Sequence, residues 1–314
     1  MRPRLLSPAI FAATRGAVGP LDWLVCGMST RHAVVAGESR LDLAARLPHL
    51  AGLSAVRVVI GEQAHGRRIA VIVQGDEQNG PPKTADQCAE TEKRAAADPK
   101  VRAGVNVRVV EIPPGRKGAG SPVEIPGVDG LIVSDPGILV AVSTADCVPI
   151  VLADERARRS AVLHAGREGT RLGIVPNAIE RLRDLGSRPQ DMRVWIGPSI
   201  SAAHYEVSRT IAEGFRAQFG GYGEIATGPE GRHLDLAEIN RRELLSAGVH
   251  PDRIERDPRC TFERDDLFFS YRREGRIAGR MMTFAAIATR SGRPSGSATC
   301  DFLLPNREKS AIGD

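Results

Sequence analysis

The fold is decided by residues 129–169, whose sequence is DGLIVSDPGILVAVSTADCVPIVLADERARRSAVLHAGREG. Three apolar runs in this stretch predict buried strands, at residues 138–143, 148–152 and 161–163. Cys147 lies at the junction of the first two runs, and His164 directly follows the third. Because strand ends hold side chains at fixed separations, we expect both side chains to be rigidly placed. A thiol and an imidazole brought together serve either in a metal site or as a Cys–His nucleophile, and both possibilities are open at this point.

The composition is that of a globular protein with an aliphatic core. The chain has 314 residues, of which 42% are hydrophobic and 26% charged, enough for one large core or two small ones. Aromatic residues make up only 4%, so we expect a core of Ala, Val, Leu and Ile. The net charge of +5 is modest, and the basic residues are scattered and not interleaved with aromatic ones. Nucleic-acid binding is therefore not expected.

The cysteines form an odd, widely spaced set without a CxxC pair: Cys26, Cys88, Cys147, Cys260 and Cys300. This pattern argues against a disulfide scaffold and indicates a reducing compartment, so we expect a cytoplasmic protein. The apolar run near the N-terminus is short and is interrupted by Pro8 and Arg15, which is not typical of a signal peptide. No segment reaches about 18 uninterrupted apolar residues, so no membrane span is expected.

The chain divides into one domain with loose ends. Residues 1–20 are expected to be a loose N-terminal arm, and residues 291–314, rich in Ser, Gly and Pro and then charged, a disordered tail. Residues 21–290 form the domain, and the polar, Pro- and Gly-rich stretch at about 75–127 indicates a surface insertion. The expected strands and helices mix without strict βαβ alternation, which favours an α+β fold.

Further elements are expected from periodicity and capping signals. Strands are predicted at residues 21–28, 56–60, 69–73 and 192–196. Helices are predicted at residues 40–50, at residues 172–185 before Gly186, after a capping box of Thr210 and Glu213, and after one of Asp235 and Glu238. The apolar stretch 281–288 is compatible with either a helix or a strand.

Three potential ligands follow predicted strands: His65, Cys147 and His164. Together they offer nitrogen, sulfur and nitrogen donors and leave a fourth tetrahedral position open, as a catalytic zinc requires. Each residue also has an ordinary interpretation when taken alone. His65 is compatible with a surface or satisfied core histidine, and Cys147 with a small buried apolar residue.

The surrounding motifs resemble one known family. GEQAHG (residues 61–66), TADCVPIVLAD (144–154), AVLHAG (161–166) and FFSYRREGRIAGR (268–280) are similar to the laccase-domain family, formerly called multi-copper polyphenol oxidoreductases. The resemblance runs from about residue 26 to residue 288, apart from the insertion. It implies a metal site at His65, Cys147 and His164, with zinc as the ion and copper as an older assignment. It also implies a single domain with α/β/β/α layers, a fold shared with certain cysteine-dependent deamidase toxins.

The resemblance further implies a purine nucleoside enzyme. Members of this family look like phosphorylases of adenosine, inosine and guanosine that also deaminate adenosine, so a purine nucleoside and phosphate are the expected partners. Arg31, in the sequence STRH, matches a family T-R and is a candidate for contact with phosphate or ribose; it is also compatible with a plain surface arginine. Asp146 is a candidate for orienting His65 or His164 or for proton transfer, or else a turn former at the strand break.

The chain departs from the family beside the second histidine. The family pattern H-A-G-W-R-G is replaced here by HAGREG, which puts Arg167 and Glu168 at the two changed positions. A guanidinium plane stacks on a purine as an indole does, so Arg167 is a candidate for substrate binding. Glu168 is expected to weaken any anion site nearby. Cys260, in the pair Cys-Thr, is compatible with a pocket wall or, more simply, with a buried structural cysteine.

Three rival functions are compatible with the sequence. One is a thiol hydrolase or deamidase in which Cys147 attacks and His164 acts as the base. Another is a copper-dependent polyphenol oxidase, although seven scattered histidines do not supply the imidazoles that multi-copper clusters use. The last is a non-catalytic binding protein that keeps the fold, which the changes at Arg167 and Glu168 favour. The oligomeric state cannot be derived from the sequence.

Overall fold

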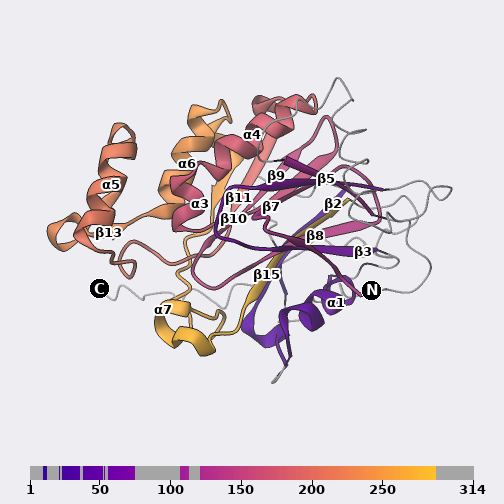
Figure 1. Ribbon diagram of the computed structural model, residues 1–314, viewed down its shortest axis with the longest axis horizontal. Coiled ribbons are helices and arrows are strands. Elements are labelled where there is room, and N and C mark those ends of the chain that lie inside the picture. The colour runs from indigo at the N-terminus through magenta and orange to yellow at the C-terminus, as the bar shows by residue number, and fades with distance from the viewer. Residues whose placement is uncertain are drawn as a thin grey trace, which may run out of the picture.

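The computed structural model describes residues 10–12, 21, 23–35, 38–51, 53, 56–74, 107–112 and 121–287. Two β-sheets lie face to face, and helices cover the outer face of each, so the layers follow the order α/β/β/α (Figure 1). The α+β class and the layered single domain predicted from the sequence are confirmed.

Among the described residues, the first sheet has six strands, in the order β1-β2-β15-β8-β3-β6, and the second has seven. Their bounds are β1 (Ile10–Ala12), β2 (Leu24–Ser29), β15 (Met281–Ile287), β8 (Ile138–Thr144), β3 (Arg57–Glu62) and β6 (Val123–Pro126). The strands of the second sheet are, in order, β14 (Ile254–Arg256), β11 (Met192–Ile196), β9 (Val148–Asp154), β10 (Arg159–Ala165), β7 (Gly130–Val133), β4 (Ile69–Gln74) and β5 (Val107–Ile112). A small ribbon pairs β12 (Ala226–Thr227) with β13 (His233–Leu234).

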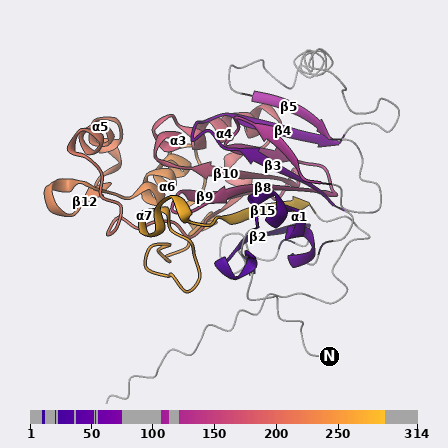
Figure 2. The ribbon, with the colours of Figure 1, turned by 60° about the horizontal axis from the view of Figure 1, so that its bottom comes forward.

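The α-helices lie outside the two sheets. Their bounds are α1 (Arg40–Leu50), α3 (Arg167–Arg171), α4 (Ile174–Asp184), α5 (Arg209–Phe219), α6 (Leu236–Ser246) and α7 (Tyr271–Glu274). Helix α1 contacts β3 and β8 of the first sheet, whereas α3 and α4 contact β10 of the second sheet, and the two groups lie on opposite sides of the molecule (Figure 2). None of the helices in the described part of the chain is long and apolar enough to cross a membrane.

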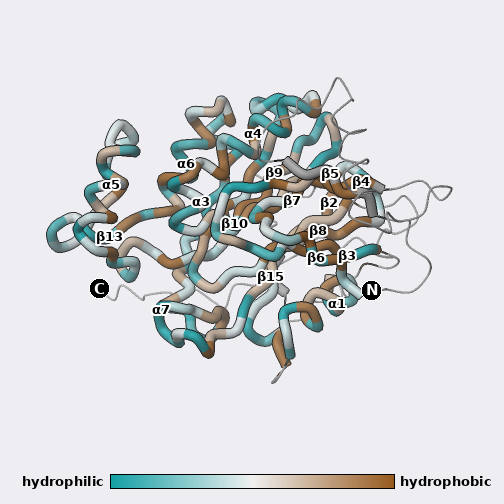
Figure 3. Tube along the Cα trace, viewed as in Figure 1, coloured by the Kyte–Doolittle hydropathy of each residue, from teal (hydrophilic) through white to brown (hydrophobic). Residues whose placement is uncertain are grey.

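Side chains that alternate along each central strand contribute to two hydrophobic cores, one on each face of the sheet. On β9, Ile150 and Leu152 pack under the helices, whereas Val151 and Ala153 pack between the sheets. A strand that is buried on both faces has to be apolar along its whole length, so the central strands could be predicted from continuous apolar runs. These strands lie in the hydrophobic interior (Figure 3). A third core of aliphatic residues lies between the first sheet and α1.

Three chain crossings carry the backbone from the first sheet to the second at the same end of the molecule. Strands β3, β6 and β8 are mutually parallel, and each is followed directly by a strand of the second sheet: β4, β7 and β9. Since parallel strands end at the same edge, the three crossings lie together. They carry His65, Asp129 and Cys147, respectively. The fold therefore gathers three residues that are far apart in the sequence.

Most of the expected elements are present, one open choice is resolved and one helix cap is corrected. The stretch 281–288 is a strand, β15, paired between β2 and β8. Helix α5 is capped by Ser208, whose hydroxyl accepts from the Ile211 N–H, and not by Thr210, which is already inside the helix. The helix expected at 172–185 is α4, which begins after Gly173; the left-handed backbone of this glycine (φ 75°) separates it from the short preceding helix α3.

Parts of the expected insertion and arm belong to the sheets. Strands β5 and β6 fall within 75–127 and are the outermost strands of the second and first sheets, paired with β4 and β3. Residues 10–12 of the expected arm pair with β2. Three other parts lie outside the described residues: the remainder of the arm, residues 75–106 and 113–120 of the insertion, and the tail at 291–314.

Candidate metal centre

His65 is held in a tight loop after β3. Its backbone is left-handed (φ 58°), a conformation that non-glycine residues adopt only when neighbours stabilise it. The stabilising neighbour is the carboxylate of Asp129, which accepts hydrogen bonds from the backbone N–H groups of Ala64 (3.2 Å), His65 (3.0 Å) and Gly66 (2.8 Å). The position of His65 therefore depends on a buried acid from a different crossing.

Cys147 is the last residue of the turn that joins β8 to β9. The residue before it, Asp146, has a left-handed backbone (φ 91°) and a buried side chain. One carboxylate oxygen of Asp146 accepts from the Thr261 hydroxyl at 2.7 Å, and the other from the Arg272 backbone N–H at 2.7 Å. The carboxylate of Asp146 thus binds the C-terminal segment to the Cys147 turn, and a role in orienting a histidine or in proton transfer stays a prediction.

His164 is near the end of β10 and is 2% exposed. Its Nδ1 lies 2.8 Å from Oδ1 of Asp129, which is fully buried. An ionised carboxylate only accepts hydrogen bonds, so Nδ1 carries the proton and donates it, which leaves Nε2 as the atom able to bind a metal. Burial alone would raise the pKa of Asp129. Hydrogen bonds from His164 and from the Gly66 N–H have the larger opposite effect, so the pKa lies below its ordinary value.

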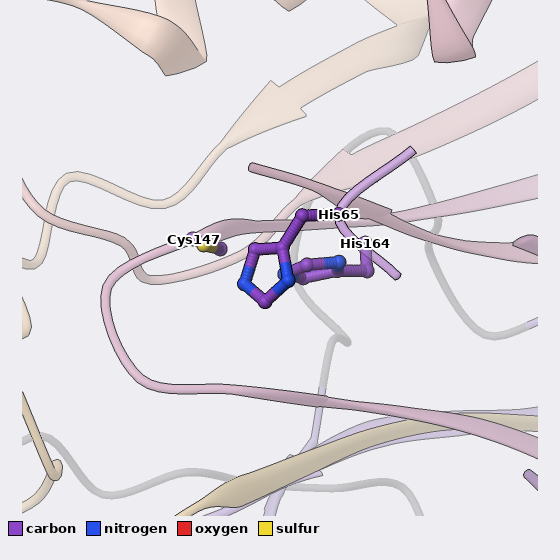
Figure 4. A group of neighbouring side chains, drawn as sticks. All are labelled: His65, Cys147 and His164. Carbon is purple, nitrogen blue, oxygen red and sulfur yellow. The ribbon is translucent and has the colours of Figure 1, made fainter. Parts of the chain in front are cut away.

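The three predicted ligands meet at one point. The ligand atoms of His65, Cys147 and His164 all lie within 4.8 Å of one another (Figure 4). The two imidazole rings are 4.9 Å apart between centroids and nearly perpendicular, at 84°. Ligands of a tetrahedral zinc, bound at about 2.0–2.3 Å, are about 3.3–3.8 Å apart, so small side-chain rotations bring these atoms to coordination distance.

Two glycines after His164 keep space for this arrangement. A Cβ on Gly166 would lie 3.0 Å from the Cys147 sulfur and 3.5 Å from carbon atoms of both histidine rings. A Cβ on Gly169 would lie 2.7 Å from the carbonyl oxygen of Gly66 in the His65 loop. The site thus has nitrogen, sulfur and nitrogen donors around a space that a single methyl group would fill. Both the donor set and the space fit a zinc ion, and soft thiolate with imidazole also suits copper.

Without a metal, the same side chains form a charged pair. Burial alone would raise the pKa of the Cys147 thiol. The charge of His164 and hydrogen bonds from both histidines have the larger opposite effect, so the pKa falls from 9.0 to about 6. Burial lowers the pKa of the His164 imidazole, but Cys147 and Asp129 raise it more strongly, from 6.5 to about 9. The two opposite shifts favour the thiolate–imidazolium form of the pair.

A cationic group lies beside Cys147. Arg167, the first residue of α3, donates a hydrogen bond to the Tyr205 hydroxyl, and the Arg272 guanidinium lies 5.2 Å above the centre of the Tyr205 ring. Burial and the nearby Cys147 charge raise the pKa of Tyr205, against the lowering effect of both arginines. Since Arg272 also donates its backbone N–H to Asp146, this group adjoins the Cys147 turn.

Glu168 and Arg31 are engaged elsewhere. Glu168 makes two hydrogen bonds with Arg171 of the same helix, at 2.8 and 2.5 Å, so its charge is balanced within α3. Arg31 donates to the Asp265 carbonyl, and its guanidinium lies 4.9 Å from the centre of the Phe269 ring. These partners belong to the C-terminal segment, so Arg31 lies apart from the group that Arg167 forms with Tyr205 and Arg272.

Asp129 is the functional residue that the sequence analysis missed. It begins the central stretch, but its position before the strand β7 is also typical of an ordinary turn residue. The contacts of Asp129 with the His65 loop and His164 can be predicted only when the β3–β4 and β6–β7 crossings are known to lie together. The available signal was an acidic residue directly before a strand buried throughout its length.

The layered fold and the two-histidine, one-cysteine site define a family. A family model described as multi-copper polyphenol oxidoreductase laccase matches residues 37–288, and the chain belongs to this family. A curated relative from Deinococcus radiodurans, named purine nucleoside phosphorylase, is 40% identical over 166 residues, 52% of this chain and 63% of the relative. The purine nucleoside phosphorylase YlmD of Geobacillus stearothermophilus is 37% identical over 164 residues, 51% of this chain and 60% of that protein. The chain thus covers less than two thirds of these relatives' length.

Solved structures confirm the fold over most of the chain. The crystal structure of YlmD from Geobacillus stearothermophilus matches with a TM-score of 0.66 at 26% identity, covering 90% of this chain and 99% of that one. The Bacillus licheniformis hypothetical protein YfiH matches with a TM-score of 0.65 at 22% identity, covering 91% and 98%. At that identity the second likeness shows the fold alone.

Proposed function

We propose that this protein is a metal-dependent purine nucleoside enzyme, which cleaves adenosine, inosine and guanosine by phosphorolysis and deaminates adenosine. The observation that carries the proposal is the convergence of His65, Cys147 and His164 around a space that fits one ion. The names of the relatives support the substrate class, since several are called purine nucleoside phosphorylases. Zinc is the proposed ion, with copper as the alternative.

His65, Cys147 and His164 would hold the ion and leave one position open to solvent or substrate. Zinc bound in this way supplies a Lewis acid and lowers the pKa of a bound water. The protein's own contribution is the fixed placement of the ligands. Asp129 keeps the proton on His164 Nδ1 and at the same time holds the His65 loop, so one acid positions both histidines.

The cationic group of Arg167 and Arg272 around Tyr205 is proposed to bind the anionic partner. Phosphorolysis requires a phosphate beside the ribose, and two guanidinium groups next to the metal ligands provide the charge. Arg31 is retained as a substrate-binding residue that acts from the C-terminal segment, which also carries Arg272. Asp146 is proposed to act by holding this segment against Cys147, because both of its oxygens already accept hydrogen bonds.

The partners proposed are a purine nucleoside and phosphate, without nucleic acid or membrane. A cytoplasmic location is proposed from the odd, widely spaced cysteines.

The test is an assay of the purified full-length protein with adenosine, inosine and guanosine, with and without phosphate. Free base that appears only with phosphate is the expected result for phosphorolysis, and inosine formed from adenosine without phosphate is expected for deamination. Both should be lost after chelation and restored by zinc or copper. If the metal-loaded protein forms no product under any of these conditions, the proposal is wrong and a binding role is favoured.

One observation favours a thiol hydrolase as the second candidate. In this candidate Cys147 would be the nucleophile, the His164 imidazole the base that takes the thiol proton and returns it to the leaving group, and the Asp129 carboxylate the group that orients His164. The two functions exclude each other at the same sulfur, because a metal-bound thiolate is not free to attack. Hydrolase activity that increases on metal removal and disappears in Cys147→Ser would favour this candidate over the nucleoside enzyme.

A further inference from the structure

A second group of potential metal ligands lies outside the site described above. His204, Cys260 and Glu263 offer one nitrogen, one sulfur and one oxygen, and these atoms all lie within 4.8 Å of one another. None of the three belongs to the first site. We propose that His204, Cys260 and Glu263 form a second metal site, which takes a zinc-like divalent ion and fixes the segment that supports Asp146.

The sulfur of Cys260 is held by backbone contacts on both sides. Cys260 pairs with Ser199 as an isolated parallel bridge, and the Thr261 N–H donates to the Ser199 carbonyl at 3.1 Å. The Ser201 N–H lies 3.3 Å from the Cys260 sulfur. Cys260 is 3% exposed, so its sulfur occupies one defined position at the junction of two segments that are far apart in the sequence.

The other two ligands are oriented and accessible. The His204 ring stacks on Phe262 with a centroid distance of 4.5 Å and an interplanar angle of 19°. Its Nε2 lies 2.9 Å from Oε1 of Glu263, and both side chains are partly exposed. A histidine–glutamate pair alone explains this contact but not the presence of a buried sulfur beside it. The Ser201 hydroxyl oxygen, in the turn that leads to His204, is buried without a hydrogen-bond partner among the described residues.

The donor set selects the kind of ion. A thiolate and an imidazole disfavour Mg²⁺ and Ca²⁺, which take oxygen ligands, and suit Zn²⁺ or Co²⁺. On binding, bonds from the ion to sulfur, nitrogen and oxygen form, the hydrogen bond between His204 and Glu263 breaks, and the Cys260 thiol releases its proton to solvent. A water would take the fourth position.

The second site adjoins the first through one hydrogen bond. Thr261, between two residues of the second site's segment, donates its hydroxyl to Asp146 at 2.7 Å, and Asp146 precedes Cys147. An ion held by Cys260 and Glu263 would therefore stiffen the support of the Cys147 turn. This is a structural role, and it does not rest on the nucleoside reaction.

The test uses Co²⁺ and the full-length Cys147→Ser protein, in which the first site has lost its sulfur. We expect this protein to bind Co²⁺ with a near-ultraviolet thiolate-to-cobalt charge-transfer band, and Zn²⁺ to displace the Co²⁺. The band should disappear when Cys260→Ser is added and persist when Cys26→Ser, a change of another buried cysteine, is added instead. Absence of the band in Cys147→Ser, or its survival in Cys147→Ser/Cys260→Ser, would overturn the inference.

Two further variants keep the test decisive if loss of Cys260 prevents folding. His204→Gln and Glu263→Gln change partly exposed side chains and should weaken Co²⁺ binding about tenfold or more in the Cys147→Ser background. The matched control is Asp266→Asn, which changes a carboxylate of the same segment that is paired with Arg264. It should leave the Co²⁺ affinity unchanged. Equal affinities for Glu263→Gln and Asp266→Asn would contradict the second site. Because Cys147 is absent throughout, the result is independent of the proposed enzymatic activity.

Discussion

The carboxylate of Asp129 lies 2.8 Å from Nδ1 of His164, and both side chains are buried. The same carboxylate accepts three backbone hydrogen bonds from the loop that carries His65. Asp129 thus determines which nitrogen of His164 carries the proton, and it also fixes the backbone position of His65. The proposed metal centre would therefore depend on this acid as well as on its three ligands.

Replacing Asp129 by Asn should weaken metal binding about 10–100-fold, the usual cost of losing a partner of a metal-bound histidine. The amide keeps one acceptor but turns an N–H₂ group toward backbone donors, so the melting temperature should fall as well. Chelator competition and thermal unfolding measure the two effects. Asp252→Asn, an exposed acid, is the control. Unchanged metal affinity in Asp129→Asn would show that the acid has no part in the site.

Replacing Gly166 by Ala should abolish metal binding, because the added methyl would lie 3.0 Å from the Cys147 sulfur. Gly214 is the matched control, since a Cβ there meets nothing within 4 Å and the residue lies inside α5. Gly214→Ala should keep the metal and gain about 0.5–1 kcal/mol of stability. Metal content and urea unfolding test both variants. A Gly166→Ala protein with a full complement of metal would contradict the arrangement of ligands around this space.

The reactivity of Cys147 should depend on metal and on pH. The folded-state pKa of the thiol is lowered to about 6, so in metal-free protein the thiolate forms as the pH rises through that value. Alkylation of Cys147 by iodoacetamide, followed by peptide mass spectrometry, should reach half of its maximal rate near that pH, and zinc should block it. His164→Gln should move the midpoint upward, because the imidazolium charge is lost. A midpoint that stays near 9 in the unsubstituted protein would contradict the thiolate–imidazolium pair.

Glu243, on α6, should make the protein less stable as the pH rises. Burial raises the pKa of Glu243 from 4.5 to about 8, so the folded state keeps a proton that the unfolded state loses. The resulting penalty is absent below pH 4.5, grows above it and is complete above about 8. Glu243→Gln should therefore raise the free energy of unfolding by a few kcal/mol at pH 8 and change it little at pH 4.5. Urea unfolding at both pH values measures this, with exposed Glu213→Gln as control; equal effects at the two pH values would contradict the burial of an ionisable carboxyl.

The sequence predicts the central strands and the metal ligands for a physical reason. Strands buried on both faces must be apolar throughout, so runs such as 138–143 and 148–152 stand out, and His65, Cys147 and His164 follow such runs. The resemblance to a known family then supplied the layered arrangement of the two sheets.

What the sequence could not give are the contacts between crossings. Asp129 touches the His65 loop only because β3–β4 and β6–β7 cross at the same end, and no local pattern records this. The hydrogen-bond partners of Asp146 could not be predicted for the same reason, since Thr261 and Arg272 lie more than a hundred residues away. Cys260 was considered alone, and its neighbour His204 belongs to another segment.

The most direct test of the central claim is an anomalous difference map, measured at the zinc absorption edge, from crystals of the protein grown with zinc. The account predicts a peak bounded by the Cys147 sulfur, Nε2 of His164 and a ring nitrogen of His65, each at about 2.0–2.3 Å. A map with no peak between these three side chains, from protein shown to be folded and exposed to zinc, would contradict it.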